Sequence, residues 1–188
     1  MGCDITKNRG QFCKSRHGGL NAIYIFPYIK HAKSLIVRDE LVLTSYPNTF
    51  VYPFHIVSGE YSENSEIDDG GELMNQSLTV TMTYLNSDNE WRKLLKKDHC
   101  VICRDRNGMF RLMGVYNGVT TDYQATTGNG HSDFNGFTFN FVGKEEDEAL
   151  YFTSLNDVGF TQVGETNNFI FQNDDNFVFQ DSNNYIFN

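Results

Sequence analysis

The sequence predicts a mainly β protein with a single α-helix and a C-terminal extension of three β-repeats. Three observations lead to this fold class. One segment alternates regularly between apolar and hydroxyl side chains, one segment has the capping and spacing of a helix, and the last twenty-one residues repeat a unit of eight. The chain is 39% apolar and 14% aromatic, which is enough to bury a hydrophobic core.

The first part of the chain is predicted to form several strands after a basic arm. Residues 1–18 are polar, basic and punctuated by glycine, which is typical of an arm or loop. Enrichment in β-branched and aromatic residues predicts strands at Leu20–Ile29, Leu35–Val37, Leu41–Thr44 and Phe50–Ser58. The acidic stretch Glu60–Glu72, which is rich in Ser, Asn and Gly, predicts a long exposed hairpin loop.

The clearest strand of the sequence covers Ser77–Tyr84. Its odd positions are all hydroxyl side chains: Ser77, Thr79, Thr81 and Thr83. Its even positions are all apolar or aromatic: Leu78, Val80, Met82 and Tyr84. Successive side chains of a strand point to opposite faces, so one face is expected to pack on a core and the other to meet water. The hydroxyl face of this strand carries no charge.

The single helix is predicted at Ser87–Lys97. Ser87 and Glu90 have the spacing of a capping box at its start. Trp91, Leu94 and Leu95 fall on one face of the helix and form an apolar stripe. Lys96 and Lys97 lie in the last turn, where positive charge complements the helix dipole.

The second half of the body is predicted to contain four more strands. Asn107-Gly108 marks a tight turn between the strands Cys100–Arg104 and Met109–Tyr116. Further strands are expected at Val119–Ala125 and Gly136–Val142, where Phe137, Phe139 and Phe141 alternate with other residues. From Ala149 onward the composition turns to Asn, Asp and Phe. We therefore place a domain boundary between residues 1–148 and 149–188.

The C-terminal extension repeats a short aromatic strand bounded by turn-forming residues. Asn168–Gln172 recurs as Asn176–Gln180 and as Asn184–Asn188. Its aromatic positions are Phe169, Phe171, Phe177, Phe179, Tyr185 and Phe187. Three such strands bury too little surface to be stable alone in water. They are expected either to close the sheet of their own domain or, as the sharper hypothesis, to clip onto another protein during assembly.

Charge is distributed unevenly along the chain. Residues 1–38 contain seven Lys or Arg and one acid, whereas residues 144–188 contain one Lys and nine acids, which gives −8 of the net −9. This distribution indicates either attraction between the head and tail of neighbouring copies or ordinary solvated termini. The acidic balance argues against general binding of nucleic acid through its phosphates. The N-terminus lacks a secretion-signal pattern and the longest apolar runs are too short to cross a bilayer, so we expect a cytosolic product without membrane contact.

No motif indicates an enzyme, a cofactor or a metal site. Cys100 and Cys103 have the spacing of a zinc-binding pair, but they lie in a predicted strand, where residues three apart point to opposite faces. Buried or idle thiols explain them better. The five histidines have no ligand spacing, and no nucleophile elbow or phosphate-binding glycine loop is present. We predict no catalytic, cofactor-binding or metal-binding residues.

The order of elements resembles a known class of virion proteins. A polar arm leads through Gly18-Gly19-Leu20 into the first strand, and the alternating strand Ser77–Tyr84 precedes the helix. The hairpin Val101–Phe110 follows, and a Phe-rich strand ends at Gly143-Lys144. Over residues 2–145 this order is similar to structural proteins of tailed phages that infect Bacteroides-type hosts, including the crAss-like phages. It resembles the tail-tube fold of tube, tail-terminator and hub proteins.

The resemblance implies a β-sandwich or half-barrel with one helix against its flank. It also implies a virion tail component, assembled in the host bacterial cytoplasm, whose copies form a homo-oligomeric ring; the sequence does not determine whether its symmetry is sixfold or twelvefold. Genome DNA would pass through the ring without specific binding, and the lumen-facing residues would be Ser77, Thr79, Thr81 and Thr83. The alternative is that this hydroxyl face meets outer solvent or another chain. The hairpin that touches the next ring or connector protein would carry Glu66, Asp68, Asp69 and Glu72.

Two other classes of function compete with a tail ring. A receptor- or carbohydrate-binding virion module would use Trp91 and the Tyr and Phe residues as a stacking surface. The place of Trp91 on the apolar stripe of the helix argues against that use. A small metal-stabilised adaptor is the third alternative.

Overall fold

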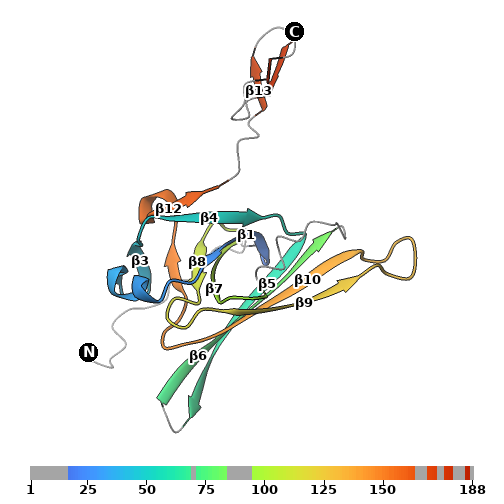
Figure 1. Cartoon of the computed structure of the whole chain (residues 1–188). Helices are drawn as coiled ribbons and strands as arrows, with labels where there is room; N and C mark the ends of the chain where they lie inside the picture. The colour runs from blue at the N-terminus through green and yellow to red at the C-terminus, as the bar shows by residue number, and fades with distance from the viewer. Residues whose placement is uncertain are drawn as a thin grey trace.

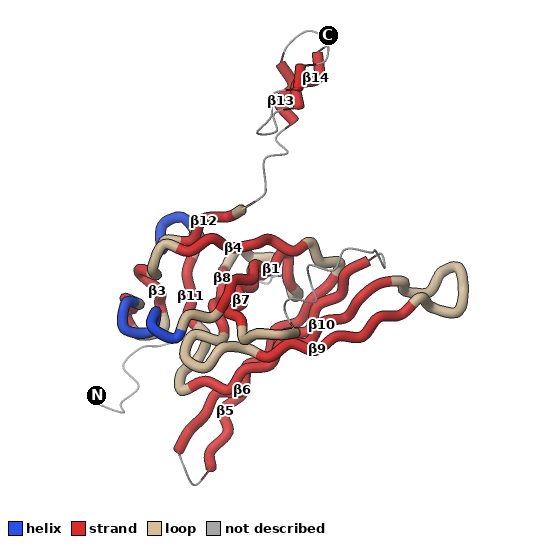
Figure 2. Tube along the Cα trace, viewed as in Figure 1, coloured by secondary structure: helices blue, strands red, loops and turns tan. Residues whose placement is uncertain are grey.

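The structure is a computed structural model of the 188-residue chain. It describes residues 17–68, 71–83 and 95–163, together with three short strands at 169–172, 176–179 and 185–186. These residues form three β-sheets and two short 3-10 helices, η1 (Lys30–Leu35) and η3 (Asn156–Val158) (Figures 1 and 2). The fold is mainly β, as predicted. Among the described residues, no helix has the length and apolar character needed to cross a bilayer.

The largest sheet has eight strands and curls into a half-barrel. In spatial order its strands are β12 (Phe160–Gln162), β4 (Thr49–Phe54), β1 (Leu20–Pro27), β7 (His99–Asp105), β8 (Phe110–Met113), β11 (Leu150–Phe152), β3 (Val42–Ser45) and β2 (Val37–Asp39). The segment that leaves β3 reaches back to the other end of the sheet. There the Tyr46 N–H donates to the Val158 carbonyl (2.7 Å) and the Thr49 N–H donates to the Gly159 carbonyl (3.0 Å).

The second sheet has four strands and packs outside the half-barrel. Its spatial order is β5 (Ser58–Asp68), β6 (Gly71–Thr83), β10 (Gly136–Glu145) and β9 (Thr120–Thr126). Every neighbouring pair in it is antiparallel. The β5–β6 hairpin is long and projects beyond the body (Figures 1 and 2). The third sheet contains the repeat strands β13 (Phe169–Gln172), β14 (Asn176–Phe179) and β15 (Tyr185–Ile186).

Three central strands of the half-barrel are buried on both faces. Along β1, Tyr24 and Phe26 join the core cluster inside the curl, whereas Ile23 and Ile25 join the cluster beneath the four-stranded sheet. This arrangement follows from the period of two in a strand, and it explains why β1 has a continuous apolar run. The second cluster is completed from the other sheet by residues that include Leu78, Val80, Phe137, Phe139 and Phe141.

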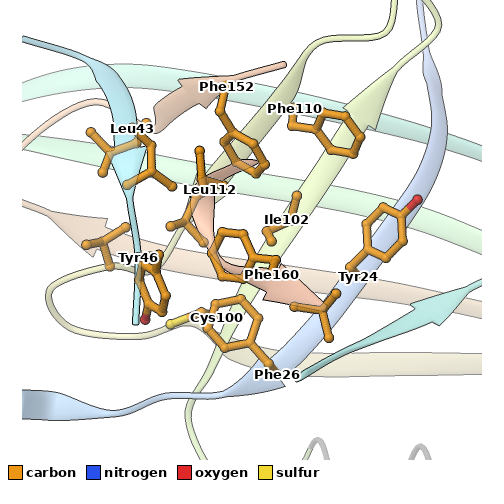
Figure 3. Close-up of a cluster of buried hydrophobic side chains, with 14 residues drawn as sticks. Tyr24, Phe26, Leu43, Tyr46, Cys100, Ile102, Phe110, Leu112, Phe152 and Phe160 are labelled. Atoms are coloured by element: carbon orange, nitrogen blue, oxygen red, sulfur yellow. The ribbon is translucent and has the colours of Figure 1, made fainter. Parts of the chain in front are cut away.

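The core inside the half-barrel is dominated by aromatic rings (Figure 3). Phe160 is fully buried, with its ring centroid 4.8 Å from that of Tyr46 and 5.4 Å from that of Phe26. Phe152 stacks on Phe110 at 5.2 Å and also contacts Phe160. These rings come from β1, β8, β11, β12 and the segment after β3. The curl therefore gathers aromatic side chains from most of the chain length.

The two described cysteines lie on opposite sides of β7, as the strand prediction required. Cys100 belongs to the inner cluster (Figure 3) and Cys103 to the outer one. Their thiols therefore cannot converge on one ion from this strand. Burial raises the pKa of Cys103 to about 12 and raises that of Cys100 as well.

Buried polar groups connect the two main sheets. Glu145, at the end of β10, accepts hydrogen bonds from the N–H groups of Tyr116 (2.7 Å) and Asn117 (3.0 Å). Gln76 on β6 accepts a hydrogen bond from the Gly114 N–H at 3.1 Å. Glu145 and Gln76 are each only 1% exposed. The loop after β8 is thereby held against the middle of β6 and the end of β10.

Several predicted strands are confirmed, with small shifts of their ends. The first strand, the Asn-Gly hairpin and the Phe-rich strand appear as β1, β7–β8 and β10, and the residues at 77–83 are the second half of β6. The region Leu35–Thr44 forms a hairpin shifted by about two residues, because η1 takes the chain through Leu35. The strand expected at Phe50–Ser58 ends at Phe54.

The exposed loop predicted at Glu60–Glu72 is wrong, because most of it is β-strand. Residues 58–68 form β5 and pair in continuous register with β6. Its polar composition indicated a loop, but the ladder is supplied by backbone groups, which any composition offers. The hairpin prediction itself holds, because the pairing of the two strands continues to Asp68 and Gly71.

Residues 149–163 belong to the body in this structure. Leu150 and Phe152 lie on β11, Phe160 lies on β12, and all three side chains are buried in the inner cluster. The body therefore extends to Val163, past the boundary expected at residue 148. Most of the predicted helix Ser87–Lys97 lies outside the described residues, and its described end, Leu95–Lys97, forms a turn and bend.

Candidate functional site

The outer face of the four-stranded sheet carries the predicted lumen residues. Ser77, Thr79, Thr81 and Thr83 follow one another along β6, on the side away from buried Leu78 and Val80. They are exposed or partly exposed. The structure therefore brings all four together in one row, as predicted.

Hydrogen bonds extend this polar row across the sheet. The Thr79 hydroxyl donates to the Asn140 side-chain oxygen on β10 (3.0 Å), and the Asn140 amide donates to Asp122 on β9 (2.8 Å). Towards the other edge, the hydroxyls of Thr81 and Ser58 are 2.6 Å apart. Two hydrogen-bonded groups, one across β6, β10 and β9 and one across β5 and β6, therefore lie on the same polar face.

Asn140 and Asp122 were not predicted as part of the site. A signal for Asn140 was present, because the strand of Phe137, Phe139 and Phe141 has one apolar side, like Ser77–Tyr84. Pairing the two one-sided strands would have placed Asn140 beside Thr79. No comparable signal marked Asp122, because its strand is exposed on most positions.

The outer face as a whole is acidic, although the hydroxyl row Ser77–Thr83 of β6 is uncharged. Glu60 and Glu66 lie on β5, and Asp122 lies on β9. The Glu66 carboxylate accepts a hydrogen bond from the Asn75 amide (2.9 Å) and lies 3.5 Å from the Lys144 ammonium. These two contacts, the Asn75 hydrogen bond first, lower the pKa of Glu66. Lys144, the cation of the described four-stranded sheet, is thus already paired with the Glu66 carboxylate.

The residues predicted to touch a neighbouring ring gather at the end of the β5–β6 hairpin. Asp68, two positions beyond Glu66, pairs with Gly71, and Glu72 pairs with Ile67. Asp69 lies outside the described residues. Ile67, which the sequence reasoning did not single out, is 81% exposed beside these acids. The hairpin end therefore combines negative charge with one large apolar side chain.

The C-terminal repeats pair with one another in a register that aligns aromatic positions. Phe169 pairs with Phe179, Phe171 with Phe177, and Phe179 also with Tyr185. Phe187 lies outside the described residues. The first aromatic position of one unit therefore meets the second aromatic position of the next, and the residues between them, Ile170, Val178 and Ile186, pair with one another.

The described residues contain no group of three or more His, Cys, Asp or Glu side chains placed to hold a metal ion. Comparisons with known proteins return no match: no family fits the sequence, and neither the curated proteins nor the solved structures include one with detectable similarity.

Proposed function

We propose that this protein is a structural component of a phage tail, a ring, tube or hub protein whose copies join into a closed ring around a DNA channel. The observation that carries the proposal is the four-stranded sheet, which has two open edges and a hydrogen-bonded polar outer face. In this proposal the tail-tube-like body also carries the flanking helix expected at Ser87–Lys97.

The two open edges are suited to pairing between copies. Within the described chain, β5 and β9 each have one hydrogen-bonded neighbour. Because all three pairings of this sheet are antiparallel, β5 and β9 run in opposite directions. Rotation about an axis along the strands would set β9 of one copy against β5 of the next and keep the antiparallel order. Repeating that step closes a ring and covers edges that would otherwise promote aggregation.

The outer face has the chemistry expected of a wall along which DNA slides. A lumen cation would bind phosphates and slow the passage of DNA. On this face Lys144 lies beside Glu66, while the hydroxyl row of β6 keeps the surface wet. Glu60 and Asp122 add repulsion towards phosphates.

The projecting parts of the molecule would join the ring to its neighbours. The β5–β6 hairpin extends past the body and presents Ile67 with Glu66 and Glu72 to the next layer. The three-stranded repeat sheet would clip onto an adjacent tail or connector protein, because three short strands need further burial to be stable.

The test is the assembly state of the purified protein and of the protein within the virion. Size-exclusion chromatography with light scattering and negative-stain imaging should show annuli with a central pore, and class averages should give their symmetry. A compact monomer without a pore under both conditions would exclude a ring.

A receptor- or carbohydrate-binding virion module is the second candidate, and one observation favours it. Phe50 and Tyr52, two residues apart on β4, are 64% and 51% exposed and share one side of the strand. Exposed aromatic rings provide stacking surface for sugars. Binding on a glycan array that is lost in the Phe50→Ala/Tyr52→Ala variant would favour this function, whereas annuli without glycan binding would favour the ring.

A further inference from the structure

We infer that the cleft between the β5–β6 hairpin and the β7–β8 turn is the docking site of the chain's own basic arm, residues 1–16. The cleft lies on the side of the β5–β6 hairpin that carries Tyr61 and Glu63, opposite the proposed lumen row, and shares Glu60 of the edge strand β5 with the lumen face. The inference does not depend on ring formation. It assigns a binding site to the basic arm. The sequence alone left open whether this arm binds a neighbouring copy or is simply solvated.

The cleft has a volume of about 940 Å³. One wall comes from the hairpin, with Tyr61, Glu63 and Met74, and the other comes from the body, with Asp105, Arg111 and Tyr151. A space of this size accommodates several residues of an extended peptide. The tyrosine rings and Met74 provide apolar surface against which the stems of long basic side chains can pack.

The charge of the cleft is strongly negative. Five carboxylates line it, Glu60, Glu63, Glu72, Asp105 and Glu148, together with one guanidinium, that of Arg111. Arg111 is already engaged, because it lies 3.2 Å from Asp105 and its guanidinium lies over the rings of Tyr61 and Tyr151. It therefore offsets one of the five acids.

The remaining carboxylates have no cation within the described part of the chain. Glu63 accepts hydrogen bonds from the Ala149 N–H (2.8 Å) and from the Gln76 amide (3.2 Å), both neutral donors. Glu60, Glu72 and Glu148 have neither an ion-pair nor a hydrogen-bond partner among the described residues. No three acids of the described chain are grouped closely enough to hold a metal ion. An extended chain of spaced cations fits this distribution better than one ion does.

The basic arm starts at this cleft. The described chain begins at His17, which lines it, and both backbone groups of His17 are bound by Asn107 on the β7–β8 turn, at 3.2 and 3.1 Å. Residues 1–16 contain four cations, Lys7, Arg9, Lys14 and Arg16, and one acid, Asp4. Sixteen residues can reach about 50 Å when extended, more than is needed to fold back across the cleft. Tethering at its rim gives the arm an effective concentration on the order of millimolar, which makes weak ion pairs sufficient.

Docking of the arm would connect the two walls of the cleft, the β5–β6 hairpin and the body at the β7–β8 turn. The arm would contact the base of the β5–β6 hairpin and the β7–β8 turn together. The direction of the projecting hairpin would therefore depend on the arm and on ionic strength.

Zero-length carbodiimide cross-linking of the full-length protein tests this assignment. The reagent joins Lys7 or Lys14 to a carboxylate in contact with it, and peptide mass spectrometry identifies the pair. An equal mixture of ¹⁵N-labelled and unlabelled protein separates links within one chain from links between chains. We expect links from the arm lysines to Glu72 or Glu148 within one chain, with a yield that falls in 1 M salt.

The matched variants are Glu72→Lys/Glu148→Lys in the cleft and Asp39→Lys on exposed β2, outside the cleft. Each reversed cleft carboxylate should lower the docked population about two- to fivefold, and Asp39→Lys should leave it unchanged. The salt series on the unaltered protein provides the test if the double variant does not fold.

Three results would overturn the inference. The first is a set of arm links that avoids the cleft carboxylates, and the second is a yield that neither salt nor charge reversal changes. The third is a set of cleft links of which about half join differently labelled chains, the share that random pairing gives for links between chains, which would assign the cleft to a neighbour's arm. None of these results bears on whether annuli form, so the proposed ring is tested separately.

Discussion

The buried carboxylate of Glu145 accepts a 2.7 Å hydrogen bond from the main-chain N–H of Tyr116. Glu145 ends β10 in the four-stranded sheet, and Tyr116 follows β8 in the half-barrel. The same carboxylate also accepts the N–H of Asn117. One side chain thus fixes the loop of one sheet to the end of a strand in the other.

Removal of this carboxylate should destabilise the body strongly. Glu145→Ala removes the buried acceptor of two main-chain N–H groups, and hydrogen bonds to charged groups contribute roughly 1.5–3 kcal/mol each. We expect a loss of about 3 kcal/mol in the free energy of unfolding, measured by urea denaturation. Asp39→Ala, at an exposed position on β2, is the control and should change it by no more than about 0.5 kcal/mol. Equal stability of both variants would show that Glu145 does not hold the two sheets together.

The inner aromatic cluster should be the most sensitive part of the core. Phe160→Ala removes a fully buried ring that contacts Tyr46, Phe26 and Phe152, and substitutions of this kind cost roughly 3–5 kcal/mol. Phe50→Ala is the matched control, because Phe50 is 64% exposed. Thermal unfolding should show a large drop in Tm for the first variant and a small one for the second. The reverse order would contradict the position of β12 against the inner cluster.

Two kinds of strand could be predicted from the sequence. They are strands in which apolar and polar side chains alternate, and strands joined by a recognisable turn motif. Ser77–Thr83 and Phe137–Phe141 have one apolar side each, and Asn107-Gly108 marks its hairpin directly, with φ of 88° at Gly108. The lumen-facing row could be predicted for the same reason. Its extension to Asn140 and Asp122 depends on which strands are neighbours, and that order is set by packing across the whole sheet.

The missed elements are those held by distant partners. β5 is polar on most positions and depends on its pairing with β6, so its own sequence resembles a loop. β11 and β12 have three residues each, and they pair in parallel with β3 and β4, more than a hundred residues earlier. Local composition contains no information about such pairs. The Asn/Asp-rich turns around them therefore suggested an earlier end to the body.

Charge on the β9 edge should prevent ring closure without unfolding the protein. Thr120→Lys/Gln124→Lys places two cations on the exposed edge strand, and lysine on an edge opposes pairing with another strand. We expect annuli to be replaced by a monomer with unchanged circular dichroism. The control is Thr79→Lys on β6, which is not an edge. It should still form annuli, while gaining DNA retention that falls steeply with salt. Intact rings in the β9 variant would exclude β9 from the interface between copies.

The stability of the body should fall at alkaline pH. Burial raises the pKa of Cys103 to about 12 from an ordinary value of 9.0, so the folded state retains a proton that the unfolded state releases. The contribution is fully present below about pH 9 and is lost between pH 9 and about pH 12. Burial also raises the pKa values of Cys100, Tyr46 and Tyr61, which add to the same trend. Urea midpoints from pH 7 to 11 should decline, less steeply in Cys103→Val. A midpoint that rises with pH would contradict the burial of these groups.

Removal of the repeats should separate folding from assembly. A chain that ends at Val163 keeps β11, η3 and β12, and with them Leu150, Phe152 and Phe160 of the inner cluster. It should unfold at nearly the same urea concentration as the full chain, because the repeats form a sheet of their own. A chain that ends at residue 148 loses all three side chains and should fail to fold, since each buried aromatic or Leu side chain contributes roughly 2–5 kcal/mol. If the repeats are the clip, the 163-residue chain should form annuli that no longer join the neighbouring tail layer in a reconstitution assay. Normal joining by this shortened chain would remove the repeats from the assembly mechanism, and a folded 148-residue chain would restore the earlier boundary.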